Sequence, residues 1–300
     1  MVSTLNIIGA GKLGRTLGRL WARNGIFNVQ DVMAARTNSA AAAVAFIGAG
    51  RVAEAMEQTR AADVWMLTPS DDRIVECCTA LAACGRLRAG DVVFHCCGSK
   101  AASVLVAATR AGAMVASVHP VKSIADPAQA VQSFAGTWCG AEGDAVALAV
   151  LKPAFEALGA RMFNIDPEGK TIYHAASVIV CNYLTALIET GARCYEKAGL
   201  EREIALQVME PLVRETLDNV FRLGTAAALT GPIARGDHAV VARQLEALTR
   251  WQPDIADIYR KLGAVAVELA HVRGNVQGDA LAELSRILSS KLPTMTQREK

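Results

Sequence analysis

The sequence has 300 residues, of which 52% are hydrophobic and 20% charged, and its formal net charge is +2. A chain of this length and composition can bury a large core and is long enough for two domains. Its basic residues are scattered, with no run and no aromatic interleaving, so nucleic acid is not an expected partner. The N-terminus shows no signal-peptide pattern, which favours a cytoplasmic protein.

The first 165 residues alternate short β-rich runs with alanine-rich helical stretches. This alternation predicts an α/β Rossmann fold, with a doubly wound, mostly parallel sheet and helices on both faces. The predicted strands cover residues 5–8, 29–34, 64–67, 92–95, 114–118, 138–140 and 162–165.

The strand patterns stop after residue 166 and long helical patterns follow. The predicted helices cover residues 169–199, 202–224, 238–251, 253–272 and 277–291. We therefore expect a nucleotide-binding domain at 1–166, a helical substrate and dimerisation domain at 167–291, and a polar tail at 292–300.

The sequence NIIGAGKLGRTLG, beginning at Asn6, carries the first of two similar glycine motifs. Its glycines have G-x-G-x-x-G spacing between a β-branched strand and an amphipathic helix, the context that dinucleotide binding requires. The glycines allow a tight turn, close approach of a diphosphate and close packing of helix on strand. The predicted cofactor-binding residues here are Gly9, Ala10, Gly11, Lys12, Leu13 and Gly14.

The second motif, AFIGAGRVAEA, begins at Ala45 and follows an alanine-rich helical run. Alanine replaces its third glycine, at Ala53, and no acid-tipped strand follows. We therefore interpret Gly48 and Gly50 as a helix stop and a turn.

The end of the second strand distinguishes NADP from NAD. An NAD-binding protein usually has an acidic residue there, but Asp31 lies about five residues too early for that role. The strand instead ends near Arg36, Thr37 and Asn38, a basic and polar group that suits a 2′-phosphate. NADP is therefore favoured over NAD. The alternative interpretation is that these residues form an ordinary surface turn.

Ligands of open α/β sheets bind beyond the carboxyl ends of the strands. Thr68 and Pro69 follow one strand, and Gly98 and Ser99 follow the next, where cofactor ribose or nicotinamide would pass. His119 precedes a proline that holds its backbone extended. Its imidazole is either a substrate contact or a capped loop histidine.

The helical pattern that starts near residue 169 begins with Lys170 and His174, four residues apart and so on one face. Either could supply a proton to a polar substrate; alternatively, Lys170 extends to solvent and His174 satisfies a buried carbonyl. Asn182 lies about 80° from His174 around the helix. The uncharged run 171–188 has the length of a membrane span, but its polar residues favour a helix buried between packed protein surfaces.

Eight cysteines occur, with no C-x-x-C pair and no zinc-ligand spacing, so no metal site is expected. Most lie in apolar surroundings, as small core residues of a reducing compartment do.

Together with the motifs ADVWMLTPSDD, SVHPVKS, YHAASVIVCNYLTAL and LTGPIARGD, these features resemble a known family. It comprises uncharacterised Rossmann-like oxidoreductases with a C-terminal helical domain of unknown function (the domain-of-unknown-function 2520 type). More distantly, the chain is similar to pyrroline-5-carboxylate reductases and to the 6-phosphogluconate and β-hydroxyacid dehydrogenases.

The resemblance implies an NADP-type Rossmann domain and an all-α domain of the 6-phosphogluconate dehydrogenase C-terminal type, which packs against a second subunit as a homodimer. The β-hydroxyacid enzymes have a catalytic lysine where this chain has Lys170. The asparagine that follows it there is replaced here by Tyr173 or His174.

These observations predict a soluble NADP-dependent oxidoreductase. It would transfer a hydride to or from a small carbonyl, imine or hydroxy-acid substrate in the interdomain cleft, with Lys170, His174, Asn182 and His119 as candidate catalytic residues. The alternatives are a non-catalytic NADP-binding sensor and a protein that uses a deazaflavin cofactor.

Overall fold

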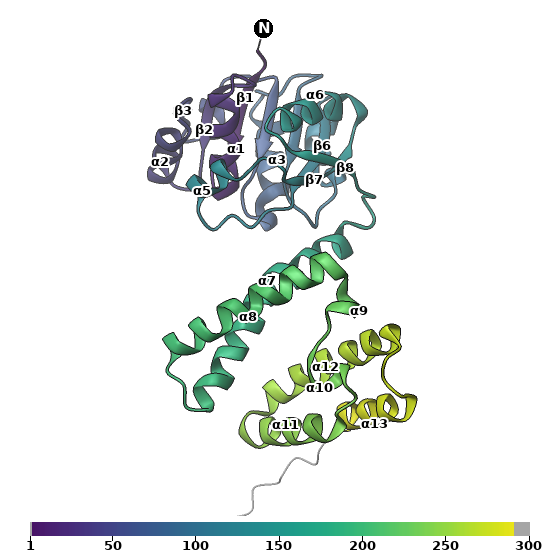
Figure 1. Ribbon diagram of the computed structural model, residues 1–300. Helices are drawn as coiled ribbons and strands as arrows, with labels where there is room; N and C mark the ends of the chain where they lie inside the picture. Colours follow the sequence, from purple (N-terminus) through teal and green to yellow (C-terminus); the bar gives the residue numbers. More distant parts are fainter. Residues whose placement is uncertain (1, 291–300) are drawn as a thin grey trace, which may run out of the picture. The chain divides into compact units, whose positions relative to one another are not determined.

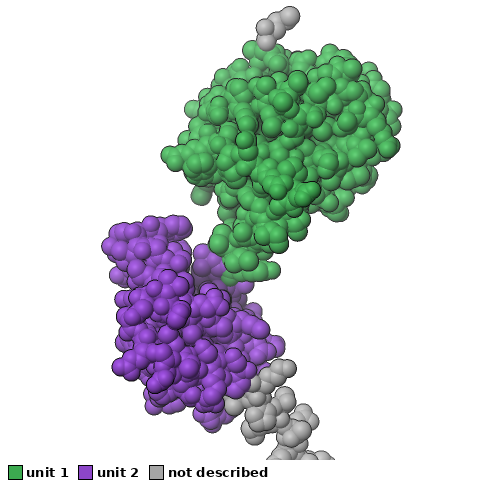
Figure 2. All heavy atoms as spheres, turned by 90° about the vertical axis from the view of Figure 1, so that its right-hand side faces the viewer, with its two compact units in different colours: residues 1–183 green, residues 184–300 purple. Residues whose placement is uncertain are grey.

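The computed structural model describes residues 2–290. The chain forms two compact units, residues 1–183 and 184–300, shown in different colours in Figure 2. The division falls inside a long helix, whereas the sequence placed the boundary ahead of that helix. The predicted polar tail at 292–300 lies outside the described residues.

The first unit contains a sheet with the strand order β3-β2-β1-β4-β5-β6-β7-β8 (Figure 1). This is the doubly wound α/β fold that the sequence predicted. The strands are β1 Thr4–Ile8, β2 Asn28–Met33, β3 Arg51–Val52, β4 Val64–Leu67, β5 Val92–His95, β6 Met114–Pro120, β7 Trp138–Gly143 and β8 Arg161–Asn164.

One strand pair departs from the parallel pattern. β6 and β7 are antiparallel, with His119 opposite Gly140. The connection between them carries only the short helix α5 (Pro127–Gln132), which packs on α1 (Lys12–Arg23) instead of crossing back over the sheet. Because a parallel neighbour needs such a crossover, β7 starts from the carboxyl end of β6.

Because successive side chains of a strand point to opposite faces, the strands contribute to two cores, one on each face of the sheet. Met66 of β4 packs on the face covered by α1, α2 (Thr37–Ile47) and α6 (Ala145–Glu156), around Trp21. Trp65 and Leu67 pack on the opposite face, against α3 (Ile74–Ala83) and α4 (Val106–Arg110). Burial on both faces explains why these strands are apolar throughout. Short 3₁₀ turns complete the unit: η1 Met56–Gln58, η2 Asp71–Arg73 and η3 Ala102–Leu105.

The second glycine motif forms the helix stop that the sequence indicated. Gly48 ends α2 in the left-handed conformation, with φ +79°. Gly50, with φ +87°, turns the chain into β3, an edge strand that the sequence analysis did not predict.

The described residues that follow β8 are mainly helical, as predicted. The helices are α7 Lys170–Lys197, α8 Arg202–Leu223, α9 Thr225–Ala228, α10 Gly231–Ala234, α11 His238–Trp251, α12 Pro253–Arg273 and α13 Gly278–Ser289. Within the second unit, α11, α12 and α13 share a core that includes Val241, Leu245 and Leu284.

Helix α7 contains the uncharged run that the sequence analysis singled out. In the described residues it is the one helix long and apolar enough to cross a membrane by length and composition alone. Its most apolar 18-residue stretch contains no residue buried within this chain. The expected burial of α7 between packed protein surfaces stays a prediction.

Candidate nucleotide and active site

Two glycines allow the loop after β1 to pack closely. Gly9 has a φ of +91°, and an added Cβ would lie 2.2 Å from the backbone nitrogen of Pro69. At Gly14 an added Cβ would lie 2.7 Å from Oγ1 of Thr68, which itself donates to the Gly9 carbonyl at 2.9 Å. Neither position has room for a larger side chain, so strand, loop and helix meet as a dinucleotide fold requires.

Gly11 has the opposite environment. An added Cβ there would meet nothing within 4 Å. Gly11 caps α1, which has no side-chain cap and no acidic residue in its first turn. The first N–H groups of a helix lack intrahelical partners and carry the positive end of the helix dipole. This open, positively polarised bend fits a diphosphate group.

A cavity of about 290 Å³ lies against this bend. It joins the glycine loop to the ends of β4 and β5, and its lining includes Gly11, Lys12, Leu13, Thr68, Pro69 and Cys97. Ala10 faces the core instead, and its N–H donates to the Met33 carbonyl at 3.2 Å. The structure thus brings the predicted loop and the β4 end together around one cavity.

Arg36, Thr37 and Asn38 lie at the start of α2. Arg36 is the N-cap residue, with extended backbone, and the helix has no side-chain cap. The three side chains are exposed, so the guanidinium and the first N–H groups of α2 are both available to an anion.

Asp31, the possible NAD-type acid, is engaged elsewhere. It is fully buried within β2 and pairs with Arg51 at 2.7 Å and with Arg60 at 2.9 Å. Burial acts to raise the pKa of Asp31, but hydrogen bonds from Arg60 and Arg51 outweigh it and lower the pKa. Because its carboxylate is paired with these two arginines, Asp31 is not placed to accept a hydrogen bond from a cofactor ribose.

Two imidazoles pack on Gly98, just beyond β5, and a phenol contacts one of them. An added Cβ at Gly98 would lie 2.4 Å from Nδ1 of His174 and 2.9 Å from Nε2 of His119. Nδ1 of His119 is 2.8 Å from the Tyr173 hydroxyl. We call His119, Tyr173 and His174 the Gly98 cluster. Nδ1 of His174 is buried and has no hydrogen-bond partner among the described residues, so a polar ligand atom would satisfy it.

The loop that carries Gly98 is fixed by a buried histidine. His95 is fully buried; its Nδ1 accepts from the Cys97 N–H at 3.1 Å, and its Nε2 lies 3.2 Å from the Ala101 carbonyl. Burial lowers the pKa of His95 to about 4. Ser99 Oγ lies 3.2 Å from Cys97 Sγ in the same loop. His95 therefore acts as a neutral brace for the loop.

Lys170 lies beneath the Gly98 cluster instead of in it. Its side chain is only 1% exposed, and Nζ lies 2.5 Å from Ser117 Oγ and 3.3 Å from Glu142 Oε1. The same Glu142 oxygen accepts the Ala102 N–H at 2.7 Å. Burial lowers the pKa of Lys170, and the Glu142 carboxylate opposes that shift. The ion pair joins the first turn of α7 to β7, and the hydrogen bond to Ser117 joins it to β6.

Asn182 is not brought to the cluster. It is exposed on α7, eight residues beyond His174, which corresponds to about 12 Å along a helix axis. Conversely, sequence reasoning missed Tyr173, Ser117 and Glu142. For Tyr173 and Ser117 a weak signal existed, since they lie beside His174 and two residues before His119. No sequence signal pointed to Glu142.

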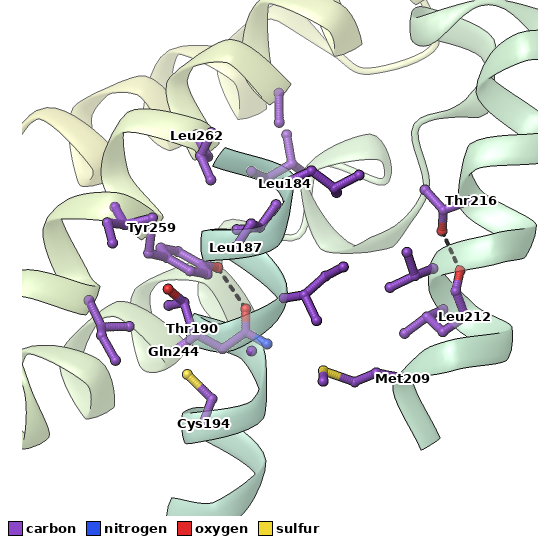
Figure 3. Close-up of a pocket in the computed structure, with 18 of the residues that line it drawn as sticks. Leu184, Leu187, Thr190, Cys194, Met209, Leu212, Thr216, Gln244, Tyr259 and Leu262 are labelled. Carbon is purple, nitrogen blue, oxygen red and sulfur yellow. Dashed lines mark hydrogen bonds between the residues drawn. The ribbon is translucent and has the colours of Figure 1, made fainter. Parts of the chain in front are cut away.

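A second cavity, of about 650 Å³, lies within the second unit (Figure 3). It lies among α7, α8, α11 and α12 and is lined mainly by apolar side chains, including Leu184, Leu187, Met209, Leu212 and Leu262. The Tyr259 hydroxyl donates to Gln244 Oε1 at 2.7 Å along one side. We call this cavity the helical groove. It offers few polar groups with which to orient a small substrate.

The fold and the glycine cradle define a protein with a Rossmann-like domain, and residues 2–120 match the family model of such a domain. Residues 137–266 match a domain of unknown function, DUF2520. The chain therefore combines a Rossmann-like N-terminal domain with a C-terminal domain of the DUF2520 family. A comparison with curated proteins found no match.

Solved structures share this fold over nearly the whole chain. A Thermotoga maritima protein is 25% identical, with a TM-score of 0.70 over 91% of this chain and 100% of that one. A Bacteroides fragilis protein, provisionally named an NADP oxidoreductase, is 21% identical, with a TM-score of 0.71 over 89% and 98%. A Plasmodium falciparum pyrroline carboxylate reductase with NADP bound is 13% identical, with a TM-score of 0.55 over 96% and 98%.

Proposed function

We propose that this protein is an NADP(H)-dependent oxidoreductase that transfers a hydride between the nicotinamide and a small carbonyl, imine or hydroxy-acid substrate. The observation that carries the proposal is the open glycine cradle: its cavity reaches from Gly11 to Cys97, and Cys97 is the chain neighbour of Gly98, on which the histidines of the Gly98 cluster pack. The NADP-related names of two structural neighbours support the choice of cofactor.

Bound NADPH would supply the hydride. Reduction of a carbonyl or imine also needs a proton on the oxygen or nitrogen. His119 and His174 both lie against Gly98, and their ring nitrogens are our candidates for hydrogen-bonding that oxygen or nitrogen. We assign Lys170 to the support of this cluster. The eight cysteines form no disulfide, which fits a reducing, cytoplasmic setting.

The proposal is tested by titrating NADPH calorimetrically and then following its absorbance with a panel of small aldehydes, ketones, keto acids and imines. Saturable binding followed by substrate-dependent oxidation supports the oxidoreductase. Saturable binding without oxidation across the panel favours the sensor alternative, and absence of binding contradicts both. Parallel titration with a deazaflavin addresses the remaining cofactor.

Replacing Arg36 with alanine tests the choice of NADP over NAD. We expect NADP affinity to fall about 10- to 100-fold, because hydrogen bonds to a charged group contribute about 1.5–3 kcal/mol. NAD affinity should change little, since NAD has no 2′-phosphate. The control is Arg23→Ala, which removes an exposed arginine from the last turn of α1. Equal losses for both nucleotides would refute the assignment.

We further propose that a second copy of this chain covers α7 and fills the helical groove. Ile179, Val180 and Tyr183 on α7 are 58%, 72% and 60% exposed. The next turns of the same helix, from Leu184 on, line the groove. A convex apolar helix and a concave apolar groove on one chain can bury each other reciprocally in a two-fold dimer. Substrate binding in the groove would not explain why Ile179, Val180 and Tyr183 are exposed.

Val180→Glu is therefore expected to convert a homodimer into a monomer in sedimentation velocity at micromolar concentration, because a buried unpaired carboxylate costs several kcal/mol. Val146→Glu places the same charge on an exposed valine of α6 and should leave the dimer intact. A monomeric wild-type protein would contradict the proposal.

A further inference from the structure

We propose that Tyr173 is a positioning residue. Its hydroxyl donates to Nδ1 of His119, which fixes the imidazole proton on Nε2 and makes His119 a neutral hydrogen-bond donor at Gly98. The catalytic consequence rests on the proposed function, whereas the proton's place on the ring does not.

The direction of this hydrogen bond follows from what each arrangement leaves unpaired. His119 Nδ1 and the Tyr173 hydroxyl are 2.8 Å apart, and within residues 2–290 this is the hydrogen bond found for that hydroxyl. If Nδ1 carried the proton, it would donate to the phenol oxygen, and the half-buried phenolic proton would have no acceptor among the described residues. If the phenol donates, both groups are satisfied. Burial raises the pKa of Tyr173 to about 12, so the proton stays on the phenol.

Packing holds the two rings in this relation. The Tyr173 ring lies edge-on to His119, with centroids 5.5 Å apart, and edge-on to Phe163 at 6.1 Å. Its hydroxyl passes over Gly140, where an added Cβ would lie only 3.2 Å away. Gly140 pairs with His119 across β6 and β7. The antiparallel strand therefore provides the gap through which Tyr173 reaches the imidazole.

The Nε2 edge of the His119 ring, opposite Nδ1, points to Gly98. Nε2 lies 2.9 Å from the position that a Cβ on Gly98 would occupy, beside Nδ1 of His174. With the proton fixed on Nε2, this edge can donate to a carbonyl oxygen or to an imine nitrogen that has a free lone pair. A glycine at position 98 lets both imidazoles lie directly against its Cα, because any side chain there would clash with them.

The charged and titratable groups around His119 keep it neutral. Burial lowers the pKa of His119 to about 4; His174 and Lys170, both on α7, act in the same direction, and Asp71 on η2 opposes them. A donor that is neutral between pH 5 and 8 can polarise a substrate without first binding a proton. Activity should therefore show no inflection from His119 near pH 6.5.

The proton position can be read by ¹⁵N NMR of protein labelled at histidine. The chain has five histidines, and comparison with His119→Gln assigns the His119 signals. We expect Nδ1 to be pyridine-like and Nε2 pyrrole-like in the wild type. In Tyr173→Phe, which keeps the ring, the two nitrogens should show averaged shifts from mixed tautomers. Tyr183→Phe removes a hydroxyl from an exposed tyrosine of α7 and should leave the His119 shifts unchanged.

With an identified substrate, Tyr173→Phe should lower kcat about three- to tenfold with little change in KM, as expected for one hydrogen bond. A pyrrole-like Nδ1 in the wild type, or unaltered His119 shifts in Tyr173→Phe, would overturn the proposal. If the tautomer is as expected but no oxidation of NADPH is ever observed, the positioning stands and the proposed function fails.

Discussion

Replacing Lys170 with methionine is expected to lower the free energy of unfolding by about 3–5 kcal/mol, because it leaves a buried carboxylate without its partner. Lys170 and Glu142 are both almost fully buried, and their oxygen–nitrogen distance is 3.3 Å. Chemical denaturation of the wild type and the variant measures the difference.

A double variant separates the charge from the packing. Lys170→Met with Glu142→Gln removes both charges and keeps an oxygen that can accept the Ala102 N–H. It should regain most of the lost stability. Arg214→Met breaks an ion pair of α8 in which both partners are largely exposed, and it should change stability by less than about 1 kcal/mol. A Lys170→Met variant as stable as the wild type would show that the buried pair does not support α7.

This pair also bears on the candidate catalytic role of Lys170. A side chain that is 1% exposed and held by Ser117 and Glu142 has no surface with which to meet a substrate. What it can do is fix the first turn of α7, from which His174 reaches Gly98 and Tyr173 reaches His119. Replacing Lys170 would therefore affect the candidate site indirectly, by shifting the turn that carries Tyr173 and His174.

Gly11→Ala should abolish most NADPH binding without loss of stability. The added Cβ meets no protein atom within 4 Å, and Gly11 has an ordinary φ of −71°, so the fold should tolerate it. The methyl group would occupy the space that a diphosphate needs. We expect affinity to fall about 10- to 100-fold, the effect of losing hydrogen bonds to a charged group. Calorimetry, and the rise in Tm on adding NADPH, would report the loss.

Gly278→Ala is the matched control. It adds the same methyl group in open space at the first residue of α13, far along the chain from the glycine loop. Its NADPH affinity should equal that of the wild type. Gly9→Ala should behave differently from both, because a φ of +91° and a contact of 2.2 Å with Pro69 would make it unstable. Full NADPH affinity in Gly11→Ala would place the nucleotide elsewhere.

Features that depend on neighbours in the chain could be predicted from the sequence. The periodicity of β4, β5 and α11 gave their bounds without error, and flanking strand and helix patterns distinguished the glycine loop from the motif at Gly48. The edge strand β3 has only two residues, too few for a period to register. The antiparallel β7 depended on where α5 packs, a contact between distant segments.

The sequence by itself determined the glycine-loop half of the candidate site, since strand, bend and helix cap are consecutive and their requirements are local. Only the tertiary structure decided the chemistry beside it. Lys170 meets Ser117 across 53 residues, and Tyr173 meets His119 across 54. Such pairs form because the sheet brings remote strand ends to one helix, and no local pattern records which side chains will face each other there.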